Sequence, residues 1–329
     1  MPYSDVDRFA GESIAVSEDA VPVVEAEAAA GDGRGWLRTH AAALRSVAVE
    51  RGAVLVRGLG LREPADAAEA SRVLTSELMT ELEGFAPRTA LPGGVYSSSQ
   101  WPPDQPMCMH HELSSAARYP RWLVLSCLEQ GSSGGAVSVA DARTVLADLP
   151  ADLAASFERD GWQLVRNYSP LLGVALADAF GTDDRAAVSA YCAAHGIAHE
   201  WMEAGELRTR QTLPAVVEHP QTGERCWFNQ IAFLNEWTMD PAVRELLLAE
   251  FGADGLPFTT LRGDGTALDR ATVDTINEVY DRHTVAVPWR KGDLLLIDNI
   301  AAAHSRAPYR GERRVVVALG DPLATRVRP

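Results

Sequence analysis

Apolar residues follow two kinds of pattern along this chain of 329 residues, one typical of helices and one typical of strands. They repeat with helical spacing over residues 36–51, 64–82 and 269–283, which predicts an amphipathic helix in each range. They form short, nearly continuous runs over residues 121–128 and 294–297, which predicts strands that are buried on both faces. The chain therefore combines helices and strands around a large apolar core.

The same patterns, together with the turn residues between them, place further elements. Strands are expected at residues 53–59, 137–140, 162–168, 215–220, 224–230 and 315–319, and helices at residues 150–159, 183–194 and 241–251. Asp141 is placed to cap a helix that begins after the strand at 137–140. Residues 172–213 interrupt the rhythm of strands, and so long an excursion is typical of a functional insertion or lid. We expect one domain over residues 1–329, with about residues 1–20 loosely ordered.

A polar triplet, His110-His111-Glu112, stands between Met107 and Ser114. In an extended segment alternate residues face the same side, so His110, Glu112 and Ser114 are expected to share a face. An imidazole and a carboxylate on one face can hold a metal ion. The triplet also fits a solvated polar turn, so by itself it does not decide between the two.

A second stretch, near the C-terminus, offers another imidazole. The apolar run at 294–297 ends in Asp298 and Asn299, which favour a turn, and His304 follows. Two imidazoles and one carboxylate that leave three positions open form the ligand shell of a non-haem Fe(II) oxygenase. Arg314 begins the next strand, where its guanidinium can bind a carboxylate through two parallel hydrogen bonds.

The two stretches together resemble a known enzyme family. The shared features are His-x-Glu at 110–112, Trp-x-x-Gly-Asp-Leu-Leu-Leu-x-Asp-Asn at 289–299 and His-x-Arg-x-Pro-Tyr-x-Gly-x-Arg-Arg at 304–314. This pattern resembles the taurine dioxygenase/clavaminate synthase-like oxygenases, which depend on Fe(II) and 2-oxoglutarate. Among them, the chain is most similar to amino-acid hydroxylases of bacterial secondary metabolism. The resemblance runs from about Gly52 to Pro322 and is specific at its two ends.

The resemblance implies a fold, a set of ligands and a reaction. The fold is α+β, with a double-stranded β-helix (jelly-roll) core, flanking helices and a helical insertion. His110, Glu112 and His304 are the implied Fe(II) ligands, Arg314 is the implied partner of the C5 carboxylate of 2-oxoglutarate, and O2 is the second co-substrate. The implied reaction is hydroxylation of an unactivated C–H bond in an amino acid or amino-acid-derived substrate, free or tethered to a carrier protein. Glu112 favours hydroxylation, because halogenases of this superfamily have a small residue at that position.

The chain departs from the family pattern at one position. Family members often have a threonine after Gly-Gly-x that helps to hold the co-substrate, whereas Val137 follows Gly134-Gly135-Ala136 here. Ser138 offers the next hydroxyl along the strand. What replaces the threonine is left open by the sequence.

Four polar or aromatic residues are candidates for contacting the substrate. They are Gln100, Ser114, Trp227 and Asn229. Three of them also have a simpler explanation: Gln100 fits a surface turn, Trp227 fits a core aromatic, and Asn229 fits an amide whose hydrogen bonds are satisfied locally. Ser114 ranks higher as a substrate contact, because it lies two residues beyond Glu112 and is expected to share its face.

Composition and charge restrict the choice of partners. The net charge of −15 argues against nucleic acid and against an anionic membrane surface, and favours a small-molecule substrate. The N-terminus lacks the features of a signal peptide, and no apolar run is long enough to span a membrane. The four cysteines form no Cys-x-x-Cys pair, which favours free thiols in a reducing cytoplasm.

Three other classes of function remain open from the sequence. His195 and His199 are four residues apart and could bind zinc in a hydrolase, although Gly196 lies between them and Glu200 follows the second histidine. A barrel that binds a small ligand without catalysis is the second alternative, and a structural or partner-binding protein is the third.

Overall fold

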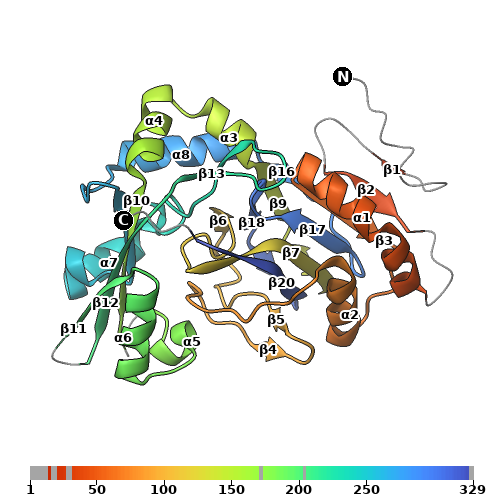
Figure 1. Ribbon diagram of the computed structural model, residues 1–329, viewed down its shortest axis with the longest axis horizontal. Coiled ribbons are helices and arrows are strands. Elements are labelled where there is room, and N and C mark those ends of the chain that lie inside the picture. The colour runs from red at the N-terminus through yellow and green to blue at the C-terminus, as the bar shows by residue number, and fades with distance from the viewer. Residues whose placement is uncertain (1–13, 16–20, 27–31, 170–172, 203–204, 326–329) are drawn as a thin grey trace.

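The computed structural model of the chain describes residues 14–15, 21–26, 32–169, 173–202 and 205–325 (Figure 1). The expected loose order at about residues 1–20 falls outside the described residues, apart from the short strand Ile14–Ala15. In the part of the chain that is described, no helix combines the length and the apolar character needed to cross a membrane.

Two β-sheets pack against each other and form the expected jelly-roll core. The larger sheet has the strand order β1-β2-β3-β17-β7-β20-β5-β4, and the smaller sheet has the order β16-β9-β18-β6. The strands of the larger sheet are β1 Ile14–Ala15, β2 Val23–Glu25, β3 Ala53–Arg57, β4 Ala90–Leu91, β5 Val95–Ser97, β7 Arg118–Glu129, β17 Leu294–Asp298 and β20 Arg314–Ala324. Those of the smaller sheet are β6 Met107–His110, β9 Val137–Asp141, β16 Val285–Ala286 and β18 Ala302–Arg306. Leu125 and Leu295 of the larger sheet meet Val137 and Val139 of the smaller one in a shared apolar cluster.

Strand β17 shows how the sequence dictates this arrangement. Leu294 and Leu296 pack against the helices on the outer face of the larger sheet, whereas Leu295 and Ile297 belong to the cluster between the sheets. Because successive side chains of a strand point to opposite faces, a run without polar positions fits a strand covered on both sides. The prediction of a strand at 294–297 that is buried on both faces is confirmed.

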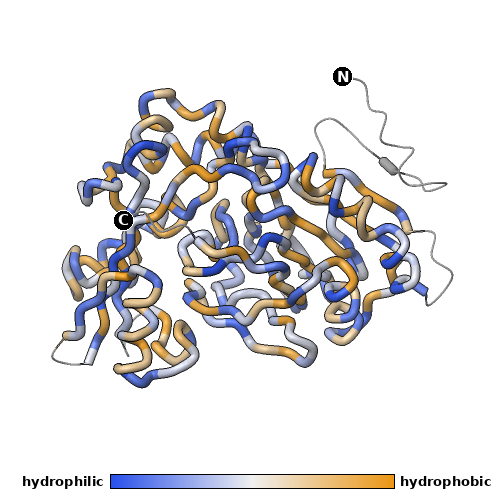
Figure 2. The backbone as a smooth tube through the Cα atoms, viewed as in Figure 1, coloured by the Kyte–Doolittle hydropathy of each residue, from blue (hydrophilic) through white to orange (hydrophobic). Residues whose placement is uncertain are grey.

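Helices α1 (Gly33–Arg51) and α2 (Pro64–Leu74) cover the outer face of the larger sheet (Figure 1). Apolar stretches, orange in Figure 2, run along these helices and the strands that they cover. The predicted helix over residues 64–82 is wrong beyond Leu74, because Thr75 turns the backbone into an extended path. The backbone N–H of Met79 then donates a 2.9 Å hydrogen bond to the carbonyl of Leu319 in β20. Strand β20 thus supplies a backbone partner that sequence periodicity cannot reveal.

A third sheet, of order β11-β12-β10-β15, lies at the other end of the molecule, at the left in Figure 1. Its strands are β10 Trp162–Tyr168, β11 Ala198–Trp201, β12 Leu207–Leu213 and β15 Phe258–Arg262. Helices α5 (Leu176–Phe180) and α6 (Arg185–Ala194) pack on it through a small apolar cluster of their own. Most of the predicted insertion at 172–213 is therefore an ordered helical and hairpin unit, and its role as a lid stays a prediction.

The remaining elements connect these layers. They are β8 Ser133–Gly134, α3 Ala142–Asp148, α4 Ala151–Asp160, β13 Val216–Glu218, β14 Arg225–Trp227, η2 Glu236–Thr238, α7 Pro241–Phe251, η3 Ala253–Gly255, α8 Arg270–Arg282 and β19 Tyr309–Arg310. Asp141 caps α3 as predicted, since its carboxylate accepts hydrogen bonds from the backbone of Arg143 and Thr144. The predicted hairpin is also present as β13 and β14.

Candidate active site

Two strands of the smaller sheet bring His110, Glu112 and His304 together. Strand β6 ends at His110, and β18 places His304 directly opposite it in an antiparallel pair, with the ring centroids 4.3 Å apart. Glu112 follows in the turn after β6. One possible ligand atom from each of the three side chains lies within 4.8 Å of the others, and all three residues are buried. The pairing of β6 with β18 therefore brings distant parts of the chain into one cluster.

The turn that begins at Glu112 also determines the direction of the Ser114 side chain. Leu113 has a left-handed backbone (φ 53°), which is costly for a residue with a branched side chain and which ends the extended path of β6. The hydroxyl of Ser114 donates to the carbonyl of His111 at 3.3 Å, and its side chain lines a different cavity together with Tyr119. Ser114 therefore does not share the side of His110 and Glu112, contrary to the expectation from strand alternation.

Asn299 holds the Glu112 backbone in place. Its side-chain oxygen accepts a 2.7 Å hydrogen bond from the N–H of Glu112, and its side-chain nitrogen donates to the carbonyls of Glu112 (2.9 Å) and Pro120 (2.8 Å). Asn299 lies in the connection from β17 to β18, and β18 carries His304. One buried amide therefore joins the segments that supply both parts of the cluster.

We expect Asn299→Ala to weaken metal binding by about 10- to 100-fold, as is typical when a residue that supports a ligand is lost. The substitution also leaves the Glu112 N–H without its partner and should cost about 1–3 kcal/mol of stability. Asn235→Ala is the matched control, because Asn235 is another buried asparagine with three comparable hydrogen bonds, two of them to Thr260. Manganese titration and thermal unfolding of both variants test this; equal loss of metal affinity in the control would contradict it.

The donor atoms of the cluster suit a divalent metal ion. His110 donates one hydrogen bond through Nδ1, to the carbonyl of Cys108 at 2.8 Å, and leaves Nε2 without a partner. Oε1 of Glu112 and Nδ1 of His304 are also buried without hydrogen bonds. Burial lowers the pKa of His110 below its ordinary value and that of His304 further still, so both imidazoles are neutral near neutral pH. Neutral imidazoles and a carboxylate are the donors that Fe(II) binds in a three-residue site.

A small cavity lies beside Glu112 and His304, between the two sheets of the core. Arg306 and Arg313 line it, and neither forms an ion pair among the described residues. Burial, followed by the charge of Arg306, lowers the pKa of Arg313 to about 10. Two neighbouring cations with no acidic partner in the described chain make this cavity suited to an anionic ligand.

Arg314 does not line this cavity. It is exposed at the beginning of β20, opposite Glu129 of β7, whereas the side chain of Arg313 is half-buried and lines the cavity. Both arginines precede the apolar part of the strand, so their order in the sequence does not reveal which one turns inward. The structure places Arg313, and not the predicted Arg314, in the lining of the cavity.

Comparisons with known proteins agree with this geometry. The family described as "Taurine catabolism dioxygenase TauD, TfdA family" matches residues 17–319. The chain belongs to this family. It is 31% identical over 274 residues to the dapdiamide synthesis protein DdaC of Enterobacter agglomerans, with 83% of each chain covered. It is 27% identical over 293 residues to a clavaminate synthase-like protein of Arabidopsis thaliana, with 86% of each chain covered.

Solved structures show the same fold. PvcB of Pseudomonas aeruginosa, described as an Fe, alpha-ketoglutarate dependent oxygenase from an isonitrile synthetic pathway, superimposes with a TM-score of 0.53 at 15% sequence identity. The match covers 96% of this chain and 94% of that chain. As a TauD/TfdA family member, the protein is a dioxygenase that uses Fe(II) and 2-oxoglutarate, and its two-histidine, one-carboxylate cluster fits that metal.

Three of the predicted substrate residues lie away from the cavity of this TauD/TfdA protein. Gln100 is exposed, while its neighbour Ser99 lines the cavity. Trp227 is fully buried against Phe157, with ring centroids 5.5 Å apart. Asn229 donates to a backbone carbonyl and accepts from a backbone N–H, as a locally satisfied amide does. The simpler explanation given for each of the three agrees with its place in the structure.

Val137, at the position of the family's threonine, lines the cavity with its apolar side chain. Ser138 is the next residue of β9, and strand alternation turns it to the other face. The serines that line the cavity belong to other segments, and they are Ser98, Ser99 and Ser305.

Sequence reasoning missed several residues that surround the cluster. Phe233 stacks on His110 with ring centroids 4.4 Å apart, and Phe85 meets the same imidazole edge-on at 5.5 Å. Arg88 binds Glu112 directly. These residues come from irregular segments, where no periodic pattern indicates the direction of a side chain. The nearest signal in the sequence is that aromatic residues flank the histidine motif on both sides.

The alternative zinc pair does not form one helical face. His195 follows the last turn of α6 as its C-cap residue, whereas His199 lies in strand β11. In the described part of the chain, the only cluster of three or more potential metal-binding side chains is the one formed by His110, Glu112 and His304.

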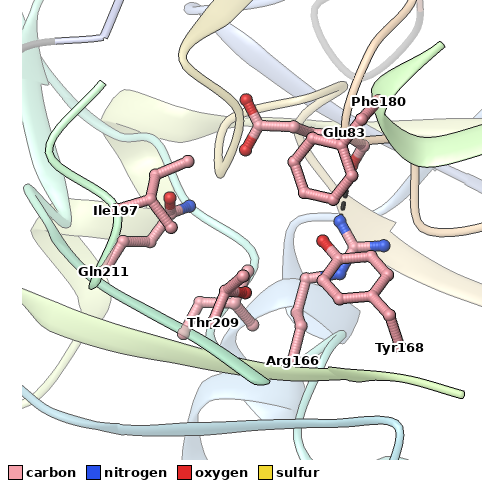
Figure 3. Close-up of a pocket in the computed structure, with 8 residues that line it drawn as sticks. Glu83, Arg166, Tyr168, Phe180, Ile197, Thr209 and Gln211 are labelled. Carbon is pink, nitrogen blue, oxygen red and sulfur yellow. Dashed lines mark hydrogen bonds between the residues drawn. The ribbon is translucent and has the colours of Figure 1, made fainter. Parts of the chain in front are cut away.

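A second polar pocket lies between the insertion, strands β10 and β12, and Glu83 (Figure 3). In Figure 3 the guanidinium of Arg166 lies beside the ring of Tyr168 and donates to the backbone carbonyl of Glu83. The carboxylate of Glu83 accepts hydrogen bonds from Ala117, in the loop after Glu112, at 2.8 Å and from Tyr191 of α6 at 2.7 Å. Glu83 therefore connects helix α6 to the loop that carries Glu112.

We expect the free energy of unfolding of Glu83→Gln to increase, relative to that of the unmodified protein, as the pH rises. Burial raises the pKa of Glu83 and outweighs the opposing effects of Ala117, Tyr191, Arg166 and His195. A raised folded-state pKa means that the native state holds the proton more tightly than the unfolded chain. The stability from this group is fully present below a pH of about 4.5 and is lost as the pH rises through the raised pKa.

Urea unfolding of both proteins over a pH series measures this difference. Glutamine keeps an acceptor oxygen but carries no charge, so the advantage of the variant should grow with pH. Glu250→Gln, at an exposed position in α7, controls for the loss of one negative charge. A difference in unfolding free energy that stays constant with pH would contradict the prediction.

Proposed function

We propose that this protein hydroxylates an unactivated C–H bond in an amino acid or amino-acid-derived substrate, free or tethered to a carrier protein. In each turnover the substrate R–H, 2-oxoglutarate and O2 give R–OH, succinate and CO2. One observation carries the proposal: a single buried site combines a two-histidine, one-carboxylate cluster with two arginines that lack an acidic partner in the described chain. The first is suited to Fe(II) and the second to a dicarboxylate.

Within this proposal, His110, Glu112 and His304 hold Fe(II), which supplies the activation of O2 when it is bound there. Arg313 binds the C5 carboxylate of 2-oxoglutarate. Arg306 supports it with a second positive charge, and two backbone carbonyls fix its guanidinium at 2.7 and 2.8 Å. Because the side chain of Arg313 is half-buried, the attraction between its guanidinium and a carboxylate is stronger than it is in bulk water.

The aromatic residues around His110 contribute by excluding water. Phe233 and Phe85 cover two sides of its imidazole, and Trp101 packs against both phenyl rings. An apolar cover limits hydrolysis and side reactions and keeps the imidazole in one orientation. These residues orient and protect the site and take no part in proton transfer.

The class of substrate is supported by the relatives and by the charge of the chain. DdaC is named for dapdiamide synthesis and PvcB for an isonitrile pathway, and both names point to natural-product biosynthesis. The net charge of −15 favours a small molecule over nucleic acid. Four free cysteines agree with a reducing cytoplasm as the place of the reaction.

The test is substrate-stimulated turnover. Purified protein is given Fe(II), ascorbate, 2-oxoglutarate and O2 together with a panel of amino acids, as free acids and as carrier-protein thioesters. We expect one member of the panel to increase succinate release and to gain one oxygen atom by mass spectrometry. If none of the panel increases succinate release above the uncoupled rate, the proposed substrate class is wrong.

A further inference from the structure

Arg88 lines the cavity and binds Glu112, a member of the proposed metal cluster, directly. It lies in the segment between α2 and β4, and its side chain is only 5% exposed. Together with Glu112 and His304 it lines the cavity between the two sheets of the core. The desolvation of the Arg88 charge is costly, so its burial beside three potential metal ligands requires compensating interactions.

The guanidinium of Arg88 contacts a different side chain through each of its nitrogens. NH2 donates to Oε2 of Glu112 at 2.7 Å, and Nε donates to the hydroxyl of Ser99 at 3.0 Å. NH1 lies 3.5 Å from a carboxylate oxygen of Glu81 and forms no hydrogen bond. The side chain is thus fixed by Ser99 and Glu81 on its outer sides and presents NH2 to Glu112.

This contact gives the two carboxylate oxygens of Glu112 different surroundings. Oε2 is held by Arg88 and lies 3.8 Å from Nε2 of His304, whereas Oε1 is buried without a hydrogen bond. A carboxylate can bind a metal through one oxygen or through both. Two imidazoles and one oxygen leave three of six positions open, while binding through both oxygens leaves only two. A chelating 2-oxoglutarate occupies two positions, so only the first arrangement leaves a position for O2.

We propose that Arg88 is a positioning residue that restricts Glu112 to binding the metal through one oxygen, so that a position for O2 stays open. The inference rests on the proposed function, in that it takes the cluster of His110, Glu112 and His304 as the metal site. It predicts that loss of Arg88 affects metal affinity and the binding of a diatomic ligand differently, although these two properties normally change together. Loss of Arg88 leaves metal affinity intact, because Glu112 gains a second free oxygen, but it removes the capacity to bind a diatomic ligand.

The experiment uses Arg88→Met and measures each property without the substrate. Mn(II) affinity is measured by electron paramagnetic resonance of the free ion. Nitric oxide, which binds at the O2 position, is added anaerobically to protein loaded with Fe(II) and 2-oxoglutarate, and the adduct is quantified by the same method. We expect the Mn(II) Kd to be unchanged or lower and the nitric oxide adduct to fall at least tenfold. Arg88→Lys, which keeps the charge but not the planar fork, should give an intermediate yield of adduct.

The matched control is Arg57→Met, which removes another buried arginine that pairs with a carboxylate, Asp293, but does not line the cavity. It should leave both measurements unchanged. A full yield of nitric oxide adduct in Arg88→Met would overturn the inference, and so would a weakening of Mn(II) binding that parallels the loss of the adduct. Mn(II) binding that is insensitive to His304→Ala would instead contradict the proposed metal site, so the two failures are distinguishable.

Discussion

Glu112→Ala and His304→Ala are each expected to abolish succinate formation and to lower metal affinity by more than about 100-fold. Each substitution removes one donor of a site that has only three, and even the loss of a residue that merely supports a ligand costs 10- to 100-fold. Both side chains are buried, so no solvent-exposed residue can move in to replace them. The measurements are Mn(II) titration and release of succinate from 2-oxoglutarate with Fe(II) and ascorbate.

The double variant His195→Ala/His199→Ala is the control. It also removes two histidines, and it eliminates the pair considered for a zinc hydrolase. Its metal affinity and succinate formation should match those of the unmodified protein. Retained metal binding in Glu112→Ala or His304→Ala would remove that residue from the proposed ligand set, and lost metal binding in the double variant would revive the zinc alternative.

Arg313→Ala is expected to raise the apparent KM for 2-oxoglutarate by more than tenfold while it changes Mn(II) affinity little. A charge-assisted hydrogen bond in a buried site is worth about 2 kcal/mol, which corresponds to a factor of about 30 in binding. The substitution does not touch the metal cluster, since the contacts of Arg313 are with Gly135 and Tyr309 and not with a member of the cluster. Steady-state kinetics with 2-oxoglutarate as the varied substrate measure the effect.

The neighbouring residue provides the control. Arg314→Ala removes the same kind of side chain one position further along the chain, but from an exposed site. Its KM for 2-oxoglutarate should stay within about twofold of the unmodified value, as is usual for an exposed charge. The opposite result, a large increase for Arg314→Ala and none for Arg313→Ala, would return the role to the residue that the sequence resemblance favours.

The larger features of the fold could be predicted because they rest on local patterns. The strand at 294–297 consists entirely of apolar residues, and helix α8 presents Val273, Ile276 and Val279 on one buried face, as its spacing predicts. The helix at 64–82 was predicted eight residues too long, because its apolar spacing continues past Thr75 while the backbone pairs with β20 instead. Periodicity reveals which residues are buried, but it does not reveal which partner buries them.

The residues of the site also fall into two groups, those that the sequence identified and those that only the tertiary structure identified. The sequence alone was enough to select His110, Glu112 and His304, because few residue types bind Fe(II) and the motifs around them are specific. The tertiary structure decided that Arg313 and not Arg314 faces the cavity, that Arg88 binds Glu112, and that Ser114 points elsewhere. The reason is geometric: a bulge, a left-handed residue or an irregular loop changes the direction of a side chain by a full face, and such features depend on contacts between segments that are distant in the chain.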